Sequence, residues 1–276
     1  EIASCLVGSE MCIRDSSKMT HEQTTFKEAL EEAQRLGFAE ADPIDDVEGV
    51  DAARKVVITS YLSFNQVIKL NDVKLVGISD ITLADINAAS ALNYKIKLIG
   101  KGTYKNGYVD ASVEPTLIHK NHQLTSVENE YNAIYVIGDA VGDTMFYGKG
   151  AGSLATGSAV VSDLLNVALF FESNLHTLPP HFELKTEETK EMMDGAEPVV
   201  IQEKSNYYIV ISHSHKSLEK VEYDIKKKLP FHKSLQLVER DQDTYAIIVT
   251  GIETSPEKVL NQSGFNVKKV YPVEGV

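Results

Sequence analysis

Cysteine is nearly missing from this sequence: among its 276 residues only Cys5 and Cys12 occur. Both fall in the first 16 residues, so the remaining chain has no thiol at all. That scarcity excludes a disulfide framework, a cysteine zinc site and a thiol nucleophile in the body of the chain. Such cysteine usage is typical of a cytoplasmic protein, and we expect that location.

Basic charge and long apolar runs are also scarce. Lysine and arginine total 27 against 40 acidic residues, a formal net charge of −13, which disfavours a nucleic-acid partner. No uninterrupted apolar run reaches the roughly 18 residues of a membrane span. The longest candidate, 159–171, is interrupted by Ser162, Asp163 and Asn166. We therefore expect no nucleic acid and no membrane, while an apolar content of 43% is enough for a real core.

The dinucleotide fingerprint G-x-G-x-x-G is absent as well. A different glycine-rich run, 148–158, follows an expected strand and opens an expected helix over 158–171. It is not a P-loop, because Lys149 is followed by Gly150 rather than by Ser or Thr. Two interpretations stay open: the backbone at the helix start holds an anion, or the glycines allow close packing against the sheet.

The most informative stretch that is present runs from Ala33 to Lys55 and is rich in acidic residues. Apolar spacing predicts a helix from Phe26 to Leu36, ended by Gly37. A second helix is expected to start near 47–51 and to run to Leu62. On it Asp51 and Lys55 are four residues apart, which predicts an i,i+4 ion pair.

This stretch has two interpretations. The simpler one is a solvated acidic loop followed by an ordinary surface ion pair. The other rests on Lys55, which leads directly into Val56, Val57 and Ile58. That apolar run suggests a largely buried helix, on which a lysine faces a cleft whose carboxylates keep it charged and oriented.

The fixed positions of this stretch resemble the signature of the homoserine dehydrogenase family. They are Ala33, Gly37, Phe38, Ala39, Asp42, Pro43, Asp46, Val47, Gly49, Asp51 and Lys55. Segments further along the chain agree in order, at 80–84, 94–100, 113–124, 132–142 and 148–163. The resemblance covers 18–163 and favours the cleft interpretation.

The resemblance implies an NAD(P)-dependent oxidoreductase that interconverts L-homoserine and L-aspartate 4-semialdehyde in threonine, methionine and isoleucine biosynthesis. It implies that Lys55 is the acid/base and that Asp51 orients it and touches the substrate. Glu40 would bind the substrate ammonium group, and Asp46 would complete the polar wall. Acidic neighbours favour the charged form of Lys55, so the bound cofactor or a further lysine has to favour the neutral form.

For the cofactor, NADP or NAD, the resemblance implies backbone contacts at Gly37 and Gly150. The family's usual G-P-G-A-G has Lys149 at the proline position here, which leaves cofactor preference open. Family members carry an N-terminal nucleotide-binding half, whereas this sequence has no fingerprint for one. The resemblance therefore implies a truncated fragment, inactive alone, that dimerises with a second copy.

Four segments are expected. Residues 1–17 form a leader foreign to the protein, because Cys5–Ser16 resembles translated sequencing-adapter read-through. Residues 18–172 form the catalytic and substrate-binding domain, and 173–204 form a linker with Pro179 and Pro180. Residues 205–276 form a small C-terminal domain.

The pattern of the C-terminal segment predicts a βαββαβ, ferredoxin-like unit. It resembles an ACT module, an amino-acid-sensing domain. The usual D-x-P-G turn is replaced by residues 213–216, so a threonine effector and a purely structural or dimerising role both stay open. The alternative function for the chain is accordingly a regulatory or dimerisation module without catalytic activity.

The expected fold class is α/β (α+β): a mixed open sheet covered by helices, followed by the ferredoxin-like unit. Strands are expected at 74–79, 95–100, 107–115 and 132–138, the last one central, with a helix at 83–92 capped by Thr82. His119 and His122 lie three apart, but no third ligand is near, so we expect no metal. A hydrogen-bonding role is expected for His122.

Overall fold

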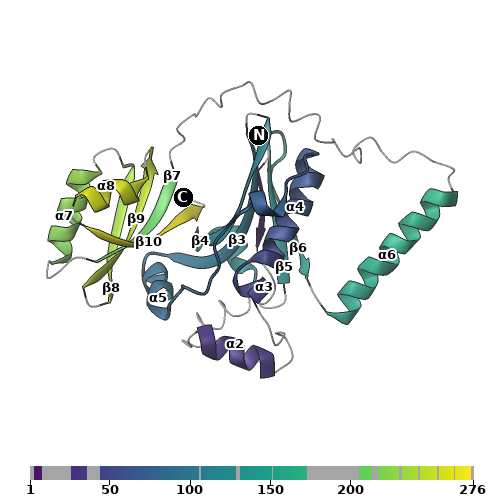
Figure 1. Ribbon diagram of the computed structural model, residues 1–276, viewed down its shortest axis with the longest axis horizontal. Helices are drawn as coiled ribbons and strands as arrows, with labels where there is room; N and C mark the ends of the chain where they lie inside the picture. The colour runs from purple at the N-terminus through teal and green to yellow at the C-terminus, as the bar shows by residue number, and fades with distance from the viewer. Residues whose placement is uncertain are drawn as a thin grey trace.

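The computed structural model describes residues 3–7, 26–35, 44–105, 107–128, 131–150, 152–172, 205–212, 217–229, 232–241, 243–253, 255–263 and 265–274. Its strands form one mixed sheet in the order β6-β5-β1-β3-β4-β10-β7-β9-β8, with β2 paired to β4 (Figure 1). The strands are β1 Ala3–Val7, β2 Lys74–Leu75, β3 Tyr94–Lys105, β4 Tyr108–His119, β5 Tyr131–Gly138, β6 Gly142–Lys149, β7 Ser205–Ser212, β8 Ser234–Asp241, β9 Thr244–Ile252 and β10 Asn266–Glu274. The helices are α2 Phe26–Arg35, α3 Ile44–Val47, α4 Val50–Phe64, α5 Leu83–Ala91, α6 Ser153–Glu172, α7 Leu218–Lys228 and α8 Pro256–Gln262, with single 3-10 turns at η1 Leu70–Asp72 and η2 Gln123–Ser126. The expected class, a mixed sheet with helices and a ferredoxin-like unit, is confirmed.

Helix α4 lies close against β3 and β4 because glycines let it approach. A β-carbon at Gly100 of β3 would lie 2.4 Å from Cγ2 of Val56. At the start of the helix, Gly49 has φ +82°, and a β-carbon there would lie 2.9 Å from Cγ1 of Val113. Two turns of α4, with Ala52, Ala53 and Val56, are thereby buried on the sheet. The position of this helix fixes the face on which the candidate site lies.

The predicted helices are found, with two differences. The second helix of the acidic stretch is α4, which begins within the expected range, and a short helix that was not predicted, α3, precedes it. Helix α6 begins at Ser153, inside the glycine-rich run, rather than at 158. Helix α5 begins after Thr82 as predicted, and its capping box is complete: Thr82 accepts from the backbone of Asp85, and Asp85 accepts from the backbone of Thr82. The cap residue was recognisable because the capping box is a local pattern.

Two strand expectations were wrong. The segment 132–138 was expected to be central, but β5 lies next to the edge strand β6. Strand β6 was not predicted, because its glycines and polar residues hide the alternation of a strand. It pairs with β5 from Gly138↔Gly142 to Tyr131↔Lys149. The expected strand 74–79 is reduced to Lys74–Leu75.

Strand β1 lies inside the stretch 1–17 that the sequence suggests is foreign. It pairs antiparallel with β3 on one side and with β5 on the other. A strand at this place closes the sheet between two long neighbours, whatever its side chains are. The interpretation of residues 1–17 as a foreign leader therefore stays a prediction.

The C-terminal unit has the predicted order β7-α7-β8-β9-α8-β10, and its strands lie in the order β10-β7-β9-β8. What the sequence pattern did not predict is its junction with the rest. Strand β10 pairs in parallel with β4, with Val273 opposite Leu117 and Glu274 opposite Ile118. One sheet therefore runs through both units (Figure 1).

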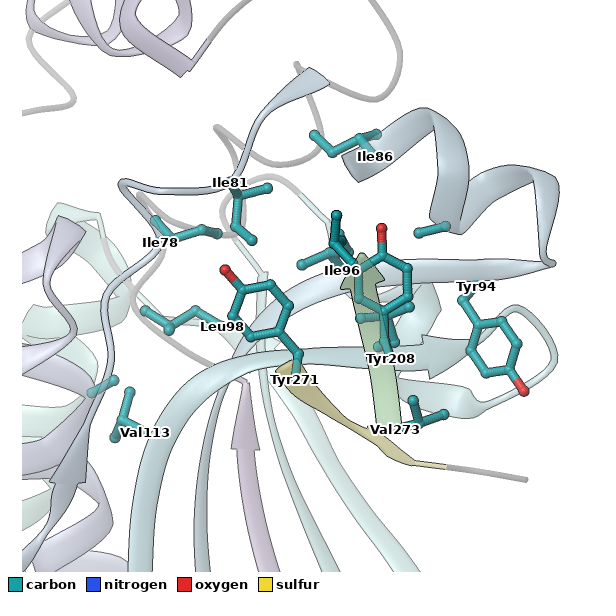
Figure 2. Packing of buried hydrophobic residues seen from close by; sticks show 14 of the residues in the cluster. Ile78, Ile81, Ile86, Tyr94, Ile96, Leu98, Val113, Tyr208, Tyr271 and Val273 are labelled. Carbon is teal, nitrogen blue, oxygen red and sulfur yellow. The ribbon is translucent and has the colours of Figure 1, made fainter. Parts of the chain in front are cut away.

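A shared apolar core reinforces this junction (Figure 2). Tyr208 and Tyr271 of the C-terminal unit stack with ring centres 6.3 Å apart and pack among Ile81, Ile96 and Leu98. Burial raises the pKa of Tyr208 above its ordinary range and that of Tyr271 to about 12. Both rings therefore stay neutral in the folded protein at ordinary pH.

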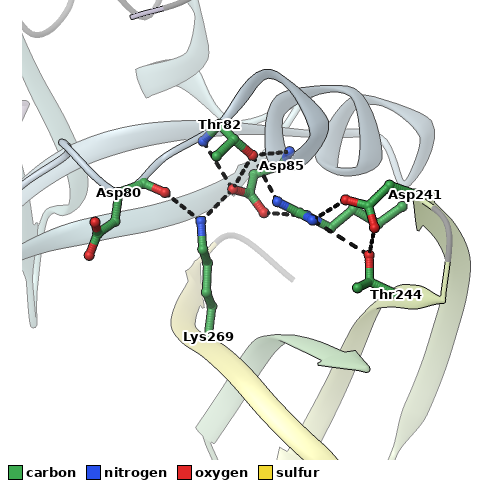
Figure 3. Close-up of polar contacts among 7 residues, drawn as sticks. Asp80, Thr82, Asp85, Asp241, Thr244 and Lys269 are labelled. Atoms are coloured by element: carbon green, nitrogen blue, oxygen red, sulfur yellow. Dashed lines mark hydrogen bonds and ion pairs between the residues drawn. The ribbon is translucent and has the colours of Figure 1, made fainter. Parts of the chain in front are cut away.

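A buried carboxylate also joins the two units (Figure 3). Asp85 is fully buried and accepts from Arg240 Nε at 2.7 Å and from Lys269 Nζ at 2.6 Å. The guanidinium also donates to Thr82 Oγ1 at 2.8 Å. Burial alone would raise the pKa of Asp85, but the hydrogen bonds from Arg240, Lys269 and Thr82 hold it below its ordinary value. The N-terminus of α5 is thus tied to β8 and β10.

Helix α6 stands away from the sheet with apolar residues exposed all round, among them Leu154, Leu164 and Phe171 (Figure 1). By length and composition, Ser153–Phe171 could cross a membrane: its mean hydropathy is 1.6, and none of that window is buried. No span was expected from the sequence, because Ser162, Asp163 and Asn166 interrupt this apolar run. By length and composition alone, one such helix is weak evidence for a membrane protein.

Candidate functional site

Lys55 and Asp51 form the predicted ion pair on α4, with Nζ 2.7 Å from Oδ2. Their side chains are 37% and 33% exposed. The helix is less buried than expected: Val56 lies in the core, whereas Ile58 is 58% exposed. Only one side of α4 therefore packs on the sheet, and Lys55 lies at the boundary between that side and solvent.

Lys55 opens onto a pocket of about 370 Å³ between α4 and the β5–β6 hairpin. The lining residues are Lys55, Ile58, Thr59, Asn132, Ala133, Ile134, Phe146, Tyr147, Gly148, Lys149 and Gly150. Lys55 and Gly150, almost a hundred positions apart in the chain, were predicted for the acid/base and for the cofactor contact. The fold brings these two residues to one pocket.

Gly150 passes so close to β5 that no other residue fits without a rearrangement. A β-carbon there would lie 1.9 Å from Nδ2 of Asn132. The close-packing interpretation of the glycine run therefore holds at this residue. The buried Oδ1 of Asn132 has no hydrogen-bond partner within the described part of the chain. An unpaired buried acceptor at a pocket wall is costly and suits a site that a polar ligand completes.

A second lysine lines the same pocket. Lys149 ends β6 directly opposite Tyr131 in the β5–β6 register. Its Nζ lies 5.8 Å from the centre of the Tyr131 ring, and that ring stacks on Tyr147 with centres 4.9 Å apart. The aromatic pair positions the ammonium group at the mouth of the pocket.

Among the other predicted site residues, those that the structure describes do not line this pocket. Asp46 lies in α3, where its carbonyl accepts from the backbone of Gly49 at 3.2 Å, and it is not among the lining residues. Asp51 reaches the pocket only through Lys55. Glu40 and Gly37 lie outside the described residues. The proposed substrate and cofactor contacts at these four positions stay predictions.

The two histidines are used by the η2 turn. Nδ1 of His122 accepts from the backbone of Leu124 at 3.2 Å, a contact within the turn. His122 is not among the described lining residues of the pocket, so a hydrogen-bonding role near the site stays a prediction. Burial lowers the pKa of His122, although Glu274 and Asp143 oppose the shift. His119 packs edge-on against Tyr94. Within the described ranges, no three His, Cys, Asp or Glu side chains gather into a possible metal site.

Sequence reasoning missed Asn132, Phe146 and Tyr147 as pocket residues. Asn132 begins an apolar strand, where a single polar residue carries no recognisable signal. Phe146 and Tyr147 belong to the strand that was not predicted. Their exposure, 63% and 49%, marks them only once the fold is known.

Comparison with known proteins gives the same family for both units. The sequence model described as homoserine dehydrogenase matches residues 5–165, and the one described as the homoserine dehydrogenase C-terminal domain matches 204–276. The homoserine dehydrogenase of Bacillus subtilis strain 168 is 52% identical over 151 residues, which are 55% of this chain and 35% of that protein. This chain spans about a third of the length of the curated relatives it matches.

Solved structures agree. The crystal structure of S. aureus homoserine dehydrogenase at pH 6.0 has a TM-score of 0.85 and 65% identity, covering 99% of this chain and 66% of that one. A hyperthermophilic archaeal homoserine dehydrogenase mutant in complex with NADPH has a TM-score of 0.51 and 26% identity. The match covers 60% of this chain and 47% of that one. With a family model matched over more than half of its length, an ion-paired lysine at the signature position and a C-terminal domain of the same family, this chain belongs to the homoserine dehydrogenase family.

Proposed function

We propose that this chain is the catalytic and C-terminal part of an enzyme that interconverts L-homoserine and L-aspartate 4-semialdehyde. The observation that carries the proposal is the position of Lys55, ion-paired at 2.7 Å and lining the pocket that Gly150 also lines. A regulatory or dimerising module without chemistry needs no such arrangement. The biosynthesis of threonine, methionine and isoleucine is the setting that this reaction implies.

Lys55 is proposed to move the proton of the reacting oxygen. Oxidation of an alcohol removes a hydride and a proton, so a base must reach the hydroxyl group. In reduction, the ammonium form of Lys55 gives a proton to the aldehyde oxygen. The carboxylate of Asp51 holds the ammonium group of Lys55 through the ion pair at 2.7 Å. In the oxidation direction the neutral amine has to act as the base.

Substrate binding is proposed to involve the acidic residues of the signature. Glu40 would accept from the substrate ammonium group, and Asp46 and Asp51 would complete the polar wall. The support is their place in the signature and, for Asp51, its contact with Lys55. Substitution of Glu40 by Gln is expected to raise KM for homoserine more than it lowers kcat.

The cofactor is proposed to be NADP or NAD, with its nicotinamide end near Gly150 and Gly37. When bound, the nicotinamide supplies or receives the hydride. The chain offers two features that fit such a group: the close backbone at Gly150 and the unpaired Oδ1 of Asn132. The NADPH complex of the archaeal relative supports NADP as the cofactor.

The test is the turnover of L-homoserine with NAD and with NADP, measured on the protein encoded by the complete reading frame. We expect turnover with at least one cofactor and the reverse reaction with the semialdehyde. The 276-residue chain alone is expected to be inactive in the same assay. Absence of turnover in the longer protein, shown to be folded by circular dichroism, would contradict the proposal.

The domain limits 18–172, 173–204 and 205–276, a homodimer and a cytoplasmic location belong to the same proposal. The two family matches, over 5–165 and 204–276, support the division into two domains. The scarcity of cysteine supports the cytoplasmic location. Sedimentation velocity tests the dimer, and a titration with threonine tests an effector site in the C-terminal unit.

Residues 1–17 are proposed to be a foreign leader. The support is the resemblance of Cys5–Ser16 to translated sequencing-adapter read-through. The family match from residue 5 and the pairing of β1 with β3 count against it. Sequencing of the source DNA across codons 1–25 decides the point. A continuous reading frame with these codons in the genome would contradict the proposal.

A further inference from the structure

We infer that Asn132 is a positioning residue of the pocket of Lys55. Its side chain fixes the backbone of the glycine segment, residues 148–150, which includes the proposed cofactor contact at Gly150. The effect on cofactor binding rests on the proposed function, whereas the effect on the backbone does not. Asn132 acts through the glycine segment and takes no part in the chemistry itself.

The first support is the contact between Asn132 and Gly150. The three atoms that a β-carbon at Gly150 would meet first all belong to the side chain of Asn132, with Cγ at 2.5 Å and Cβ at 3.1 Å. The φ angle of Gly150 is not positive, so the residue is needed for space rather than for conformation. Gly150 therefore packs on the amide of Asn132.

The second support is the strand register. Asn132 of β5 lies directly opposite Gly148 of β6. A β-carbon at Gly148 would meet no described atom within 4 Å, so Asn132 does not pack on its direct partner. It contacts Gly150 instead, the diagonal neighbour two positions further along the chain. The side chain thus lies across the glycine segment.

The third support is the strand that carries Asn132, which is held in the core. The next residue, Ala133, is 1% exposed and shares an apolar cluster with Tyr135. Tyr135 Oη donates to Asp143 Oδ2 at 2.6 Å, which joins β5 to β6. The amide of Asn132 therefore comes from a fixed strand, whereas the glycine segment has no side chain at 148 or 150 with which to pack.

The fourth support is the cost of an amide at this place. Oδ1 of Asn132 is buried and has no hydrogen-bond partner among the described residues. An apolar side chain of similar size, such as leucine, would fill the space without an unpaired acceptor. Polar groups kept at such a cost are typical of functional sites.

Asn132 and Gly150 line the pocket together with Lys55. A displacement of the glycine segment would therefore change the wall of that pocket. Errors of about 1 Å in the placement of a reactant are enough to impair an enzyme. Asn132 accordingly sets where the cofactor lies relative to Lys55.

The test is a double-mutant cycle on the protein of the complete reading frame, with dissociation constants measured by the fluorescence of bound NADPH or NADH. Asn132→Ala and Gly150→Ala should each weaken cofactor binding about tenfold, with KM for homoserine within about twofold. Independent effects would multiply to about a hundredfold in the double variant. We expect about tenfold, because the added methyl group fits the space that the shortened Asn132 leaves.

Gly148→Ala is the matched glycine control, because a β-carbon there meets open space among the described atoms. Asn71→Ala, at an exposed residue of η1, is the asparagine control. Both should bind the cofactor within about twofold of the unchanged protein. Multiplication of the two effects in the double variant, or an unchanged dissociation constant in Asn132→Ala, would overturn the inference. A lower melting temperature alone would show a merely structural role and would overturn it as well.

Hydrogen exchange of the same protein without cofactor separates this inference from the proposed function. In Asn132→Ala the backbone amides of 148–150 should exchange about tenfold faster, and in Asn71→Ala they should not change. Unchanged exchange in Asn132→Ala would overturn the positioning role. Absence of cofactor binding and turnover in the unchanged protein would overturn the proposed function, and faster exchange would still support the positioning role.

Discussion

The pKa of an individual side chain in this protein depends on how deeply the fold buries it. Lys97 is the clearest example. It is 3% exposed on β3 and donates to the carbonyl of Val127 at 2.6 Å. Burial, with a smaller contribution from Lys95 and an opposing one from Glu128, lowers the pKa of Lys97 to about 8. The residue holds the η2 turn against the sheet, and its charge is costly.

Lys97 should make stability depend on pH in alkaline solution. Its folded pKa, about 8, lies below its unfolded value, about 10.4, so the unfolded chain binds more protons between them. Stability from this group therefore rises with pH across that window, by on the order of 3 kcal/mol. Urea unfolding of the wild type and of Lys97→Met, from pH 7 to 10.5, gives the difference in their free energies of unfolding at each pH. Tyrosine titration affects both proteins equally and therefore cancels in this difference.

The exposed Lys227 supplies the control for this prediction. Lys227→Met removes the same charge but should leave the pH dependence of stability unchanged. If the wild type and Lys97→Met keep a constant difference in unfolding free energy across the window, the account of Lys97 is wrong.

At the scale of elements, features formed within one turn of the chain could be predicted from the sequence. Strand pairing between distant segments could not. The box of Thr82 and Asp85 was recognisable because both residues lie within one turn. Strand β6 was hidden by its glycines, and the junction of β10 with β4 joins segments about 150 residues apart. Lys55 was found from the signature, but Asn132 was not, because its importance arises from the contact with Gly150.

Asp85 belongs to the capping box at the N-terminus of α5 and forms ion pairs with Arg240 and Lys269 of the C-terminal unit. Asp85→Ala should lower the free energy of unfolding by about 3–5 kcal/mol, since it leaves Arg240 and Lys269 half-buried without their partner. Chemical denaturation at pH 7 measures this loss. Asp80→Ala, at an exposed neighbour, should cost less than about 1 kcal/mol.

The stabilisation that Asp85 gives the folded protein should be lost in acid. Its folded pKa is held below the unfolded value, so its stabilisation is fully present above the unfolded pKa and is lost as pH falls through the folded pKa. A loss of less than about 1 kcal/mol in Asp85→Ala at neutral pH would contradict the role of this residue as the tie between units.

At the scale of the whole molecule, one sheet and one core run through both units. Tyr208, Tyr271 and Val273 of the C-terminal unit share a cluster with Ile96 and Leu117. We therefore predict that both units unfold in a single calorimetric transition. Val273→Ala should move that whole transition to lower temperature without splitting it.

Two resolved transitions would show that the junction is weaker than the shared sheet implies. The sequence suggested two domains joined by a linker, because composition changes along the chain at 173–204. Sequence patterning describes each unit separately, whereas the pairing of β10 with β4 is a long-range contact that no local signal carries.

The proposed role of Lys55 in proton transfer is tested most directly by kcat for homoserine oxidation. We would measure it for Lys55→Ala in the protein of the complete reading frame, beside Arg54→Ala. Arg54 is the neighbouring cation, paired with Asp45 at 2.6 Å, and it is not among the described residues that line the pocket. We predict a loss of about 10²–10⁴-fold for Lys55→Ala and less than about threefold for Arg54→Ala. Turnover of Lys55→Ala within about threefold of the unchanged enzyme would contradict this role.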